Sequence, residues 1–218
     1  MNADSQAAAT KRELAIEAAD AELPGSAVVP HGADAIVLFA HGSGSGRLSP
    51  RNRQVAAVLE DAGLATLLFD LLTEDEATDR ANIFDIDLLG QRLAATTDWI
   101  SGQDDLRSLR VGYFGASTGA AAALRAAAAL GGRIVAVVSR GGRPDLAGDA
   151  LAAVQSPTLL IVGGNDDAVL GLNRQAQAEL RCPNDLVVVP GATHLFEEPG
   201  TLEAVAEHAR NWFLRHLG

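Results

Sequence analysis

The chain has 218 residues, a length that suits one domain with a single substantial core. Its 28 acidic and 17 basic residues give a formal net charge of −11, which argues against partners such as nucleic acid or anionic membrane surfaces. A single cysteine, Cys182, excludes an internal disulfide and is typical of a reducing compartment. No apolar run is long enough to span a bilayer, and the N-terminus lacks the pattern of a signal peptide, so we expect a cytoplasmic protein.

The N-terminal part of the chain predicts a tail followed by a β-hairpin. Residues 1–11 are polar and rich in alanine, so we expect a flexible tail before one domain that covers residues 12–218. Two strand-like runs, at 13–18 and 26–29, lie on either side of the turn-forming sequence Leu23-Pro24-Gly25. They predict an antiparallel hairpin at the edge of a sheet.

Apolar strands and amphipathic helices alternate through the rest of the chain. The expected strands cover residues 35–40, 65–69, 109–114, 134–138, 158–162 and 186–189. The expected helices cover residues 50–61, 84–101 and 117–130, a short segment after 144, a segment ending near 180, and residues 200–217. The pattern predicts an α/β sandwich with a mostly parallel sheet and helices on both faces. Only a short segment separates the strands at 134–138 and 158–162, so we expect no cap domain.

The sequence Gly115-Ala116-Ser117-Thr118-Gly119 lies between a predicted strand and an alanine-rich helix. This G-x-S-x-G pattern in strand–turn–helix context is typical of a nucleophile elbow, where glycines allow a tight turn that exposes the serine Oγ. The oxygen then lies at a helix N-terminus, where free N–H groups favour developing negative charge. In a glycine-rich chain the bare pattern also arises by chance, and the flanking strand and helix argue against that reading.

A histidine and an acid follow two other predicted strands. His194 comes after Gly191 in the loop beyond the last strand, so we expect it to act as the general base for Ser117. The orienting acid is Asp166 or Asp167, and the other member of the pair would cap the next helix. We assign Asp166 to the triad and Asp167 to capping.

The loop His41-Gly42-Ser43 follows the first apolar strand and ends at the same edge of the sheet. We expect the Ser43 and Thr118 N–H groups to form an oxyanion hole, with His41 in a structural role.

Two arginines follow the strand at 134–138. Arg140 and Arg143 either face the substrate, where a guanidinium favours a carboxylate, or pair with acidic residues of the protein. The sequence leaves both readings open.

Four motifs resemble those of the α/β hydrolases: His41-Gly42, Gly115-x-Ser117-x-Gly119, Gly164-x-Asp166-x-x-Val169 and Gly191-x-x-His194. The chain is most similar to the dienelactone-hydrolase-like group, over residues from about 12 to the end. The resemblance implies a Ser…Asp…His triad that hydrolyses small carboxylic esters, thioesters or lactones through an acyl-enzyme. Dienelactone hydrolases carry a cysteine nucleophile where this chain has Ser117, so the resemblance favours a serine esterase.

Two other readings compete with the hydrolase. Residues 35–70 also have the strand, glycine-rich turn, helix, strand and final acid of a dinucleotide-binding unit, but Arg47 stands where that unit needs its third glycine. A non-catalytic binding protein with the hydrolase fold is the second alternative, because sequence does not show that the triad residues meet in space. The chain has no P-loop lysine pattern and no Cys/His cluster, so we expect no cofactor and no metal, with a small ester as the partner.

Overall fold

The structure is a computed structural model that describes residues 9–217. Residues 1–8, which make up most of the expected tail, lie outside the described residues. The last two residues of that expected tail belong to the sheet instead, because strand β1 begins at Thr10. Within the described part, every helix is too short or too polar to traverse a bilayer.

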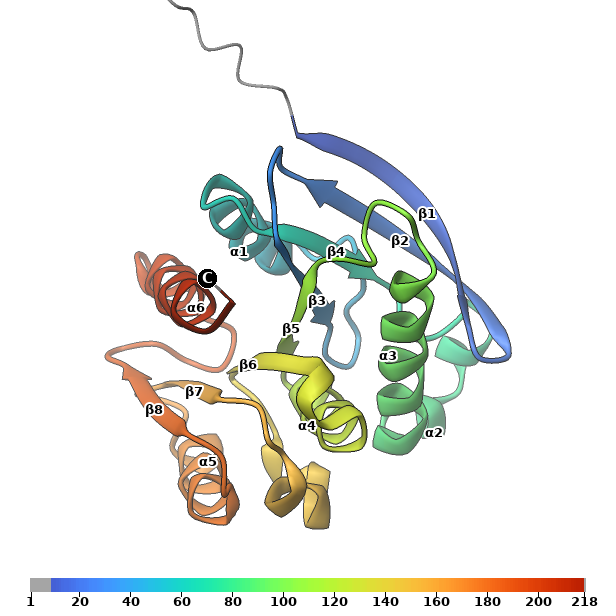
Figure 1. The fold of residues 1–218 in the computed structure, drawn as a ribbon. Coiled ribbons are helices and arrows are strands. Elements are labelled where there is room, and N and C mark those ends of the chain that lie inside the picture. Colours follow the sequence, from blue (N-terminus) through green and yellow to red (C-terminus); the bar gives the residue numbers. More distant parts are fainter. Residues whose placement is uncertain (1–8, 218) are drawn as a thin grey trace, which may run out of the picture.

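Eight strands form one sheet in the order β1-β2-β4-β3-β5-β6-β7-β8 (Figure 1). The pairings of β1 with β2 and of β2 with β4 are antiparallel, and all the others are parallel. The strands are β1 (Thr10–Ala18), β2 (Ala21–Val29), β3 (Ala35–Ala40), β4 (Ala65–Phe69), β5 (Arg110–Ala116), β6 (Ile134–Arg140), β7 (Thr158–Gly163) and β8 (Asn184–Val189). β3, β4 and β7 are buried along their whole length, as their continuous apolar sequences predict.

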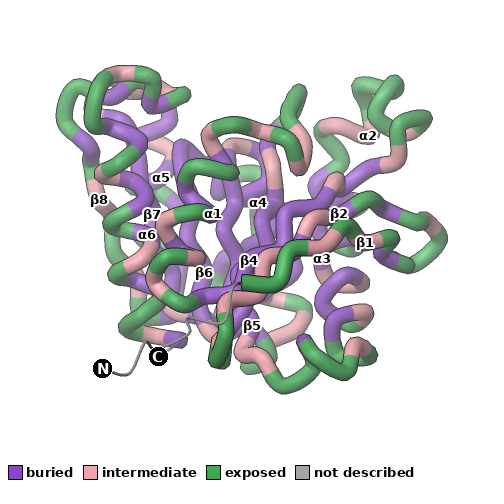
Figure 2. Tube along the Cα trace, turned by 90° about the horizontal axis from the view of Figure 1, so that it is seen from above, coloured by how far each residue is buried: buried purple, intermediate pink, exposed green. Residues whose placement is uncertain are grey.

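Helices cover both faces of the sheet, as expected. Helices α1 (Pro50–Asp61) and α6 (Thr201–Leu217) pack on one face, and α3 (Ile86–Ser101), α4 (Thr118–Leu130) and α5 (Asp167–Glu179) pack on the other. The short α2 (Arg80–Ile83) and the 3-10 segments Glu76–Thr78, Gly131–Arg133 and Pro144–Ala153 complete the connections. Figure 2 shows buried residues concentrated in the central strands, whereas α2 is exposed.

The predicted hairpin is present, but its turn lies elsewhere. The chain reverses at Ala19 and Asp20, where Ala19 has a positive φ of 59°, and the expected turn Leu23–Gly25 lies inside β2. Gly25 lies in a crowded place, because an added Cβ would lie 2.6 Å from the Ile16 Cδ1 atom of the neighbouring strand and the buried Ile16 side chain would have to shift. The Pro-Gly pair, which the sequence indicates as a turn, therefore lies within a strand at a point where the neighbouring strand is close.

The parallel strands end at one edge of the sheet, and the loops that follow β3, β5, β6, β7 and β8 meet there. The connection from β6 to β7 contains only the 3-10 segment Pro144–Ala153, with a kink at Gly148. The fold is therefore the single-domain α/β sandwich that the sequence predicts, without a cap domain.

Candidate active site

Ser117 lies at the turn between β5 and α4 in a strained backbone conformation. Its φ of 51° and ψ of −121° are unusual for a residue other than glycine. The two glycines of the motif make the turn possible. A Cβ on Gly115 would lie 2.5 Å from the Ala120 Cα, and a Cβ on Gly119 would collide with the Ala40 carbonyl oxygen. Ser117 thus has the geometry that the G-x-S-x-G pattern predicts.

The loop after β6 holds the backbone of Ser117 on both sides. The Ser117 N–H donates to the Arg140 carbonyl at 3.2 Å, and the Arg143 N–H donates to the Ser117 carbonyl at 3.1 Å. The fully buried Asn173 of α5 fixes this loop from below, because its side-chain amide donates to the Gly142 carbonyl at 2.9 Å. The strain at Ser117 is therefore held by the 140–143 loop, a role that the sequence did not reveal.

His194 and Asp166 meet at the ends of β7 and β8. His194 Nδ1 and Asp166 Oδ2 are 2.7 Å apart, so the carboxylate accepts a hydrogen bond from the imidazole and fixes its tautomer. The neighbouring Asn165 ties the two loops together, since its N–H donates to the Ala192 carbonyl at 2.9 Å and its side-chain amide to the Gly191 carbonyl at 3.0 Å.

Asp167 lies apart from this pair. It is exposed, and its carboxylate makes no hydrogen bond within residues 9–217. The expectation that Asp167 caps α5 was wrong: Asp166 occupies the N-cap position, with no capping bond from its side chain, and Asp167 is the first residue of the helix. The helix starts one residue earlier than a cap at Asp167 requires.

Ser117 and His194 both lie against the 140–143 loop. A Cβ added to Gly141 would lie 3.1 Å from the His194 carbonyl oxygen and 3.6 Å from its Cε1 atom, so the imidazole packs on the loop that binds Ser117. Among the described residues, no hydrogen bond joins the Ser117 hydroxyl to His194. Such bonds are often long in the absence of substrate and shorten in the complex.

Glu198 braces the loop that carries His194. Its carboxylate accepts hydrogen bonds from the Thr193 hydroxyl at 2.6 Å and from the Thr193 N–H at 3.1 Å. The Thr193 hydroxyl, with smaller contributions from backbone N–H groups, holds the pKa of Glu198 below its usual value. Sequence reasoning missed Glu198, because a partly buried glutamate near the start of a helix has no distinctive pattern.

The two residues expected in the oxyanion hole are in contact. The Ser43 N–H donates to the Thr118 hydroxyl at 3.0 Å, which joins the loop after β3 to the first turn of α4. Thr118 is the first residue of α4, where the backbone N–H has no acceptor within the helix. The geometry therefore offers two N–H groups beside Ser117.

His41 positions the Ser43 loop. Its Nε2 accepts a hydrogen bond from the Leu71 N–H at 3.0 Å, and its Nδ1 is 3.1 Å from the Gly42 carbonyl oxygen. Since the Leu71 N–H can only donate, the ring must carry its proton on Nδ1 and donate to Gly42. Burial lowers the pKa of His41, which keeps the ring neutral in this arrangement.

The two predicted substrate-binding arginines differ in their surroundings: Arg143 is paired with an acid, whereas Arg140 is buried with its Nε and Nη1 atoms lacking a hydrogen-bond partner among the described residues. Arg143 makes a bidentate ion pair with Asp145 at 2.8 and 2.7 Å, which raises the pKa of the arginine. Arg140 is only 8% exposed, and its Nη2 lies 3.5 Å from the Asn52 side-chain oxygen of α1. Its burial, reinforced by the nearby charge of Arg51, lowers the pKa of Arg140 to about 10. Pairing within the protein, one of the two readings left open by the sequence, describes Arg143.

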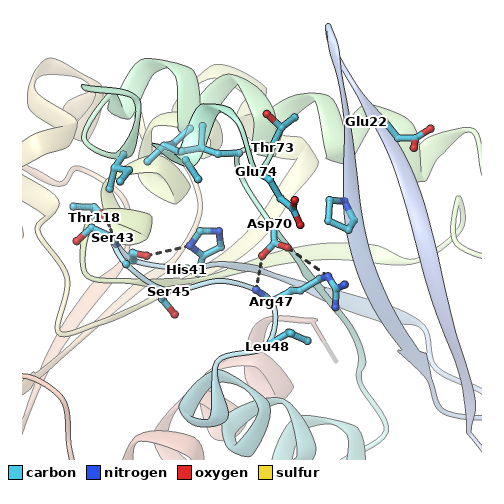
Figure 3. Close-up of a pocket in the computed structure, with 17 residues that line it drawn as sticks. Glu22, His41, Ser43, Ser45, Arg47, Leu48, Asp70, Thr73, Glu74 and Thr118 are labelled. Atoms are coloured by element: carbon cyan, nitrogen blue, oxygen red, sulfur yellow. Dashed lines mark hydrogen bonds and ion pairs between the residues drawn. The ribbon is translucent and has the colours of Figure 1, made fainter. Parts of the chain in front are cut away.

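A cavity of about 630 Å³ opens next to the Ser43 loop and Thr118 (Figure 3). Residues 41–45 and Thr118 form one end of it, and a Cβ on Gly42 would lie 2.9 Å from the Ser117 Cβ. Its volume is within the range of pockets that bind small molecules. No group of three or more His, Cys, Asp or Glu side chains in residues 9–217 is placed to hold a metal ion.

The chain resembles proteins of known structure over nearly its whole length. A dienelactone hydrolase from Anabaena variabilis is 53% identical, with a TM-score of 0.94 over 96% of this chain and 99% of that one. Est1E from Butyrivibrio proteoclasticus has the same fold, with a TM-score of 0.78 at 18% identity over 96% of this chain and 98% of that one.

A protein of Mycobacterium tuberculosis that is provisionally named a phosphoribosyl transferase is 60% identical over 205 residues, or 94% of this chain. The match covers 46% of that protein, so the chain spans about half the length of this curated relative. No protein-family model matches the chain. The similarity to the Anabaena variabilis protein covers both chains almost entirely and agrees with the eight-stranded sandwich. The chain therefore belongs to the dienelactone hydrolase family of α/β hydrolases.

Proposed function

We propose that this protein is a serine hydrolase that cleaves small carboxylic esters through an acyl-enzyme. Ser117 is the nucleophile, His194 the general base and Asp166 the orienting acid in this proposal. The observation that carries it is the 2.7 Å contact between His194 Nδ1 and Asp166 Oδ2, on loops packed against the strained turn of Ser117. A carboxylate bonded to the imidazole leaves Nε2 free to accept a proton from a hydroxyl.

The reaction follows from these roles. Ser117 Oγ attacks the ester carbonyl while His194 Nε2 takes the hydroxyl proton, and the Ser43 and Thr118 N–H groups stabilise the oxyanion. His194 then gives its proton to the alkoxide oxygen as the carbon–oxygen bond breaks, which releases the alcohol and leaves an ester on Ser117. Water, deprotonated by His194, attacks this ester, and the acid leaves as the Ser117 hydroxyl regains its proton. Asp166 stays ionised throughout and stabilises the imidazolium.

The name of the Mycobacterium tuberculosis relative does not lead us to propose phosphoribosyl transfer for this chain. The match leaves more than half of that relative without a counterpart here, so its name can refer to that other part. The contacts around Ser117, His194 and Asp166 support the roles of nucleophile, base and orienting acid that we propose, and these roles belong to acyl transfer.

Ester hydrolysis by purified protein tests this proposal. We expect wild-type protein to hydrolyse p-nitrophenyl acetate and butyrate, and Ser117→Ala to lower kcat by about a million-fold, as loss of a triad nucleophile does in other serine hydrolases. Circular dichroism should show that the variant is folded. Turnover by Ser117→Ala close to that of wild type would refute the nucleophile. A folded wild-type protein inert towards every ester would favour the alternative, a non-catalytic binding protein.

A further inference from the structure

The sheet order separates the two halves of an ester bound at Ser117. His194 and Asp166 follow β8 and β7, on one side of β5, whereas the 630 Å³ cavity lies over β2, β3 and β4, on the other side. In the proposed mechanism, His194 must reach the leaving oxygen to protonate it. The alcohol therefore leaves on the β6–β8 side, and the acyl group extends into the cavity. This inference rests on the proposed function.

Apolar and charged side chains both line the cavity, and Figure 3 shows the charged ones on the side away from Thr118. Ser43 and Thr118 form the end next to Ser117, where the carbonyl group would be held. The apolar walls are formed by Pro24, Leu48, Leu72, Ile83 and Leu89. They suit an aliphatic chain, because burying each methylene against such walls stabilises binding by about 0.8 kcal/mol.

Charged groups at the far end of the cavity are mostly negative. Glu22, Asp70 and Glu74 line this end together with one cation, Arg47. Arg47 already has two acidic neighbours, because its Nε lies 3.4 Å from an Asp70 carboxylate oxygen and its Nη1 lies 3.7 Å from a Glu13 carboxylate oxygen. Glu22 and Glu74 make no ion pair within residues 9–217. An acyl group with a terminal carboxylate would therefore meet like charge and no free cation.

We propose that this cavity is the acyl pocket, and that it takes uncharged aliphatic acyl groups and excludes those that end in a carboxylate. The dependence on charge applies to the acyl half of the ester alone, because the alcohol leaves on the other side of β5. The residue that sets it most directly is Glu74, whose side chain lies next to Asp70 at the far end (Figure 3).

Two pairs of esters test the proposal. The acyl pair is p-nitrophenyl hexanoate and the mono-p-nitrophenyl ester of adipic acid, which differ in a terminal carboxylate. The alcohol pair is 4-(hexanoyloxy)benzoate and methyl 4-(hexanoyloxy)benzoate. Both carry the same hexanoyl group, and only the first has a free carboxylate on the alcohol half. We expect wild-type kcat/KM to be about tenfold higher for the hexanoate ester than for the adipate ester. The reason is that the terminal carboxylate of the adipate ester would be repelled by the acidic side chains that line the cavity. We expect Glu74→Lys to lower this ratio about fivefold or more, and Glu74→Gln to lower it less.

Glu207 is the matched control, an exposed glutamate of α6 on the other face of the sheet. We expect Glu207→Lys to leave the acyl ratio unchanged, and the Glu74 variants to leave the alcohol ratio unchanged. Ile83→Trp, which enlarges one of the apolar walls, should lower kcat/KM for hexanoate at least tenfold relative to acetate.

The outcomes separate this inference from the proposed function. Equal or better hydrolysis of the adipate ester by wild type would overturn the charge selection. A Glu74 effect as large on the alcohol pair as on the acyl pair would overturn the acyl assignment, while both results leave Ser117 hydrolysis standing. Wild-type protein that hydrolyses none of the four esters would overturn the proposed function, and this inference with it.

Discussion

Asp166 and Asp167 are adjacent carboxylates with different surroundings. Asp166 bonds to His194, whereas Asp167 is exposed and its carboxylate makes no hydrogen bond to any residue that the structure describes. We expect Asp166→Asn to lower kcat by about ten-thousand-fold, because the amide favours the wrong imidazole tautomer. Asp167→Asn should cost less than about tenfold, through weaker interaction with the α5 dipole. Steady-state kcat on one activated ester checks both, and a large loss at Asp167 alone would reverse the assignment.

His41 links the pH dependence of stability to the oxyanion loop. Burial lowers its pKa in the folded state from the ordinary value of 6.5. At a pH between the His41 pKa of the folded protein and that of the unfolded chain, the unfolded chain binds more protons than the folded protein. The free energy of unfolding therefore falls as the pH falls below about 6.5. Protonation of His41 Nε2 would also remove the acceptor of the Leu71 N–H, so that two N–H groups would face each other.

We therefore expect His41→Gln, which keeps an acceptor but does not titrate, to flatten the decline in stability between about pH 7 and pH 5. Urea unfolding at several pH values measures this. The same slope in wild type and variant would show that His41 does not cause it.

At the scale of elements, the 140–143 loop connects the three proposed catalytic residues. It bonds to both backbone groups of Ser117, packs against His194 through Gly141, and is held by Asn173 on the helix that begins after Asp166. Asn173 stands at a core-facing position with Val169 and Ala176, so a polar residue there signals a buried partner, although not which one. The sequence therefore predicts the helix but not its function as a support for the elbow.

Asn173→Ala tests this support. The change leaves the buried Gly142 carbonyl without its donor, and we expect it to lower stability by about 1–3 kcal/mol. It should also lower kcat more than it raises KM, because the Ser117 turn loses its brace. Gln175→Ala, an exposed change on the same helix, is the control and should alter neither quantity. A stability loss with unchanged kcat would mean that Asn173 supports the fold alone.

At the scale of the whole molecule, alternation of apolar strands and helices was enough to predict the sandwich and its mostly parallel sheet. Continuous apolar sequences such as those of β3 and β7 predict strands of a parallel sheet, and the side chains of these strands are buried along their whole length. The hairpin turn was misplaced because Pro24 and Gly25 serve strand packing. Motif order predicted the Asp166–His194 contact, but the partners of Arg140 and Thr118 lie on segments far along the chain, and no local pattern encodes them.

Covalent labelling of Ser117 tests the central claim most directly. A fluorophosphonate reacts with a serine only where a base activates the hydroxyl and N–H groups stabilise the developing charge. Intact-mass and peptide mass spectrometry of treated wild-type protein should show one adduct, on Ser117. The adduct should be absent from folded Ser117→Ala and form far more slowly in His194→Ala. No adduct on folded wild-type protein, or an adduct on another residue, would contradict the account.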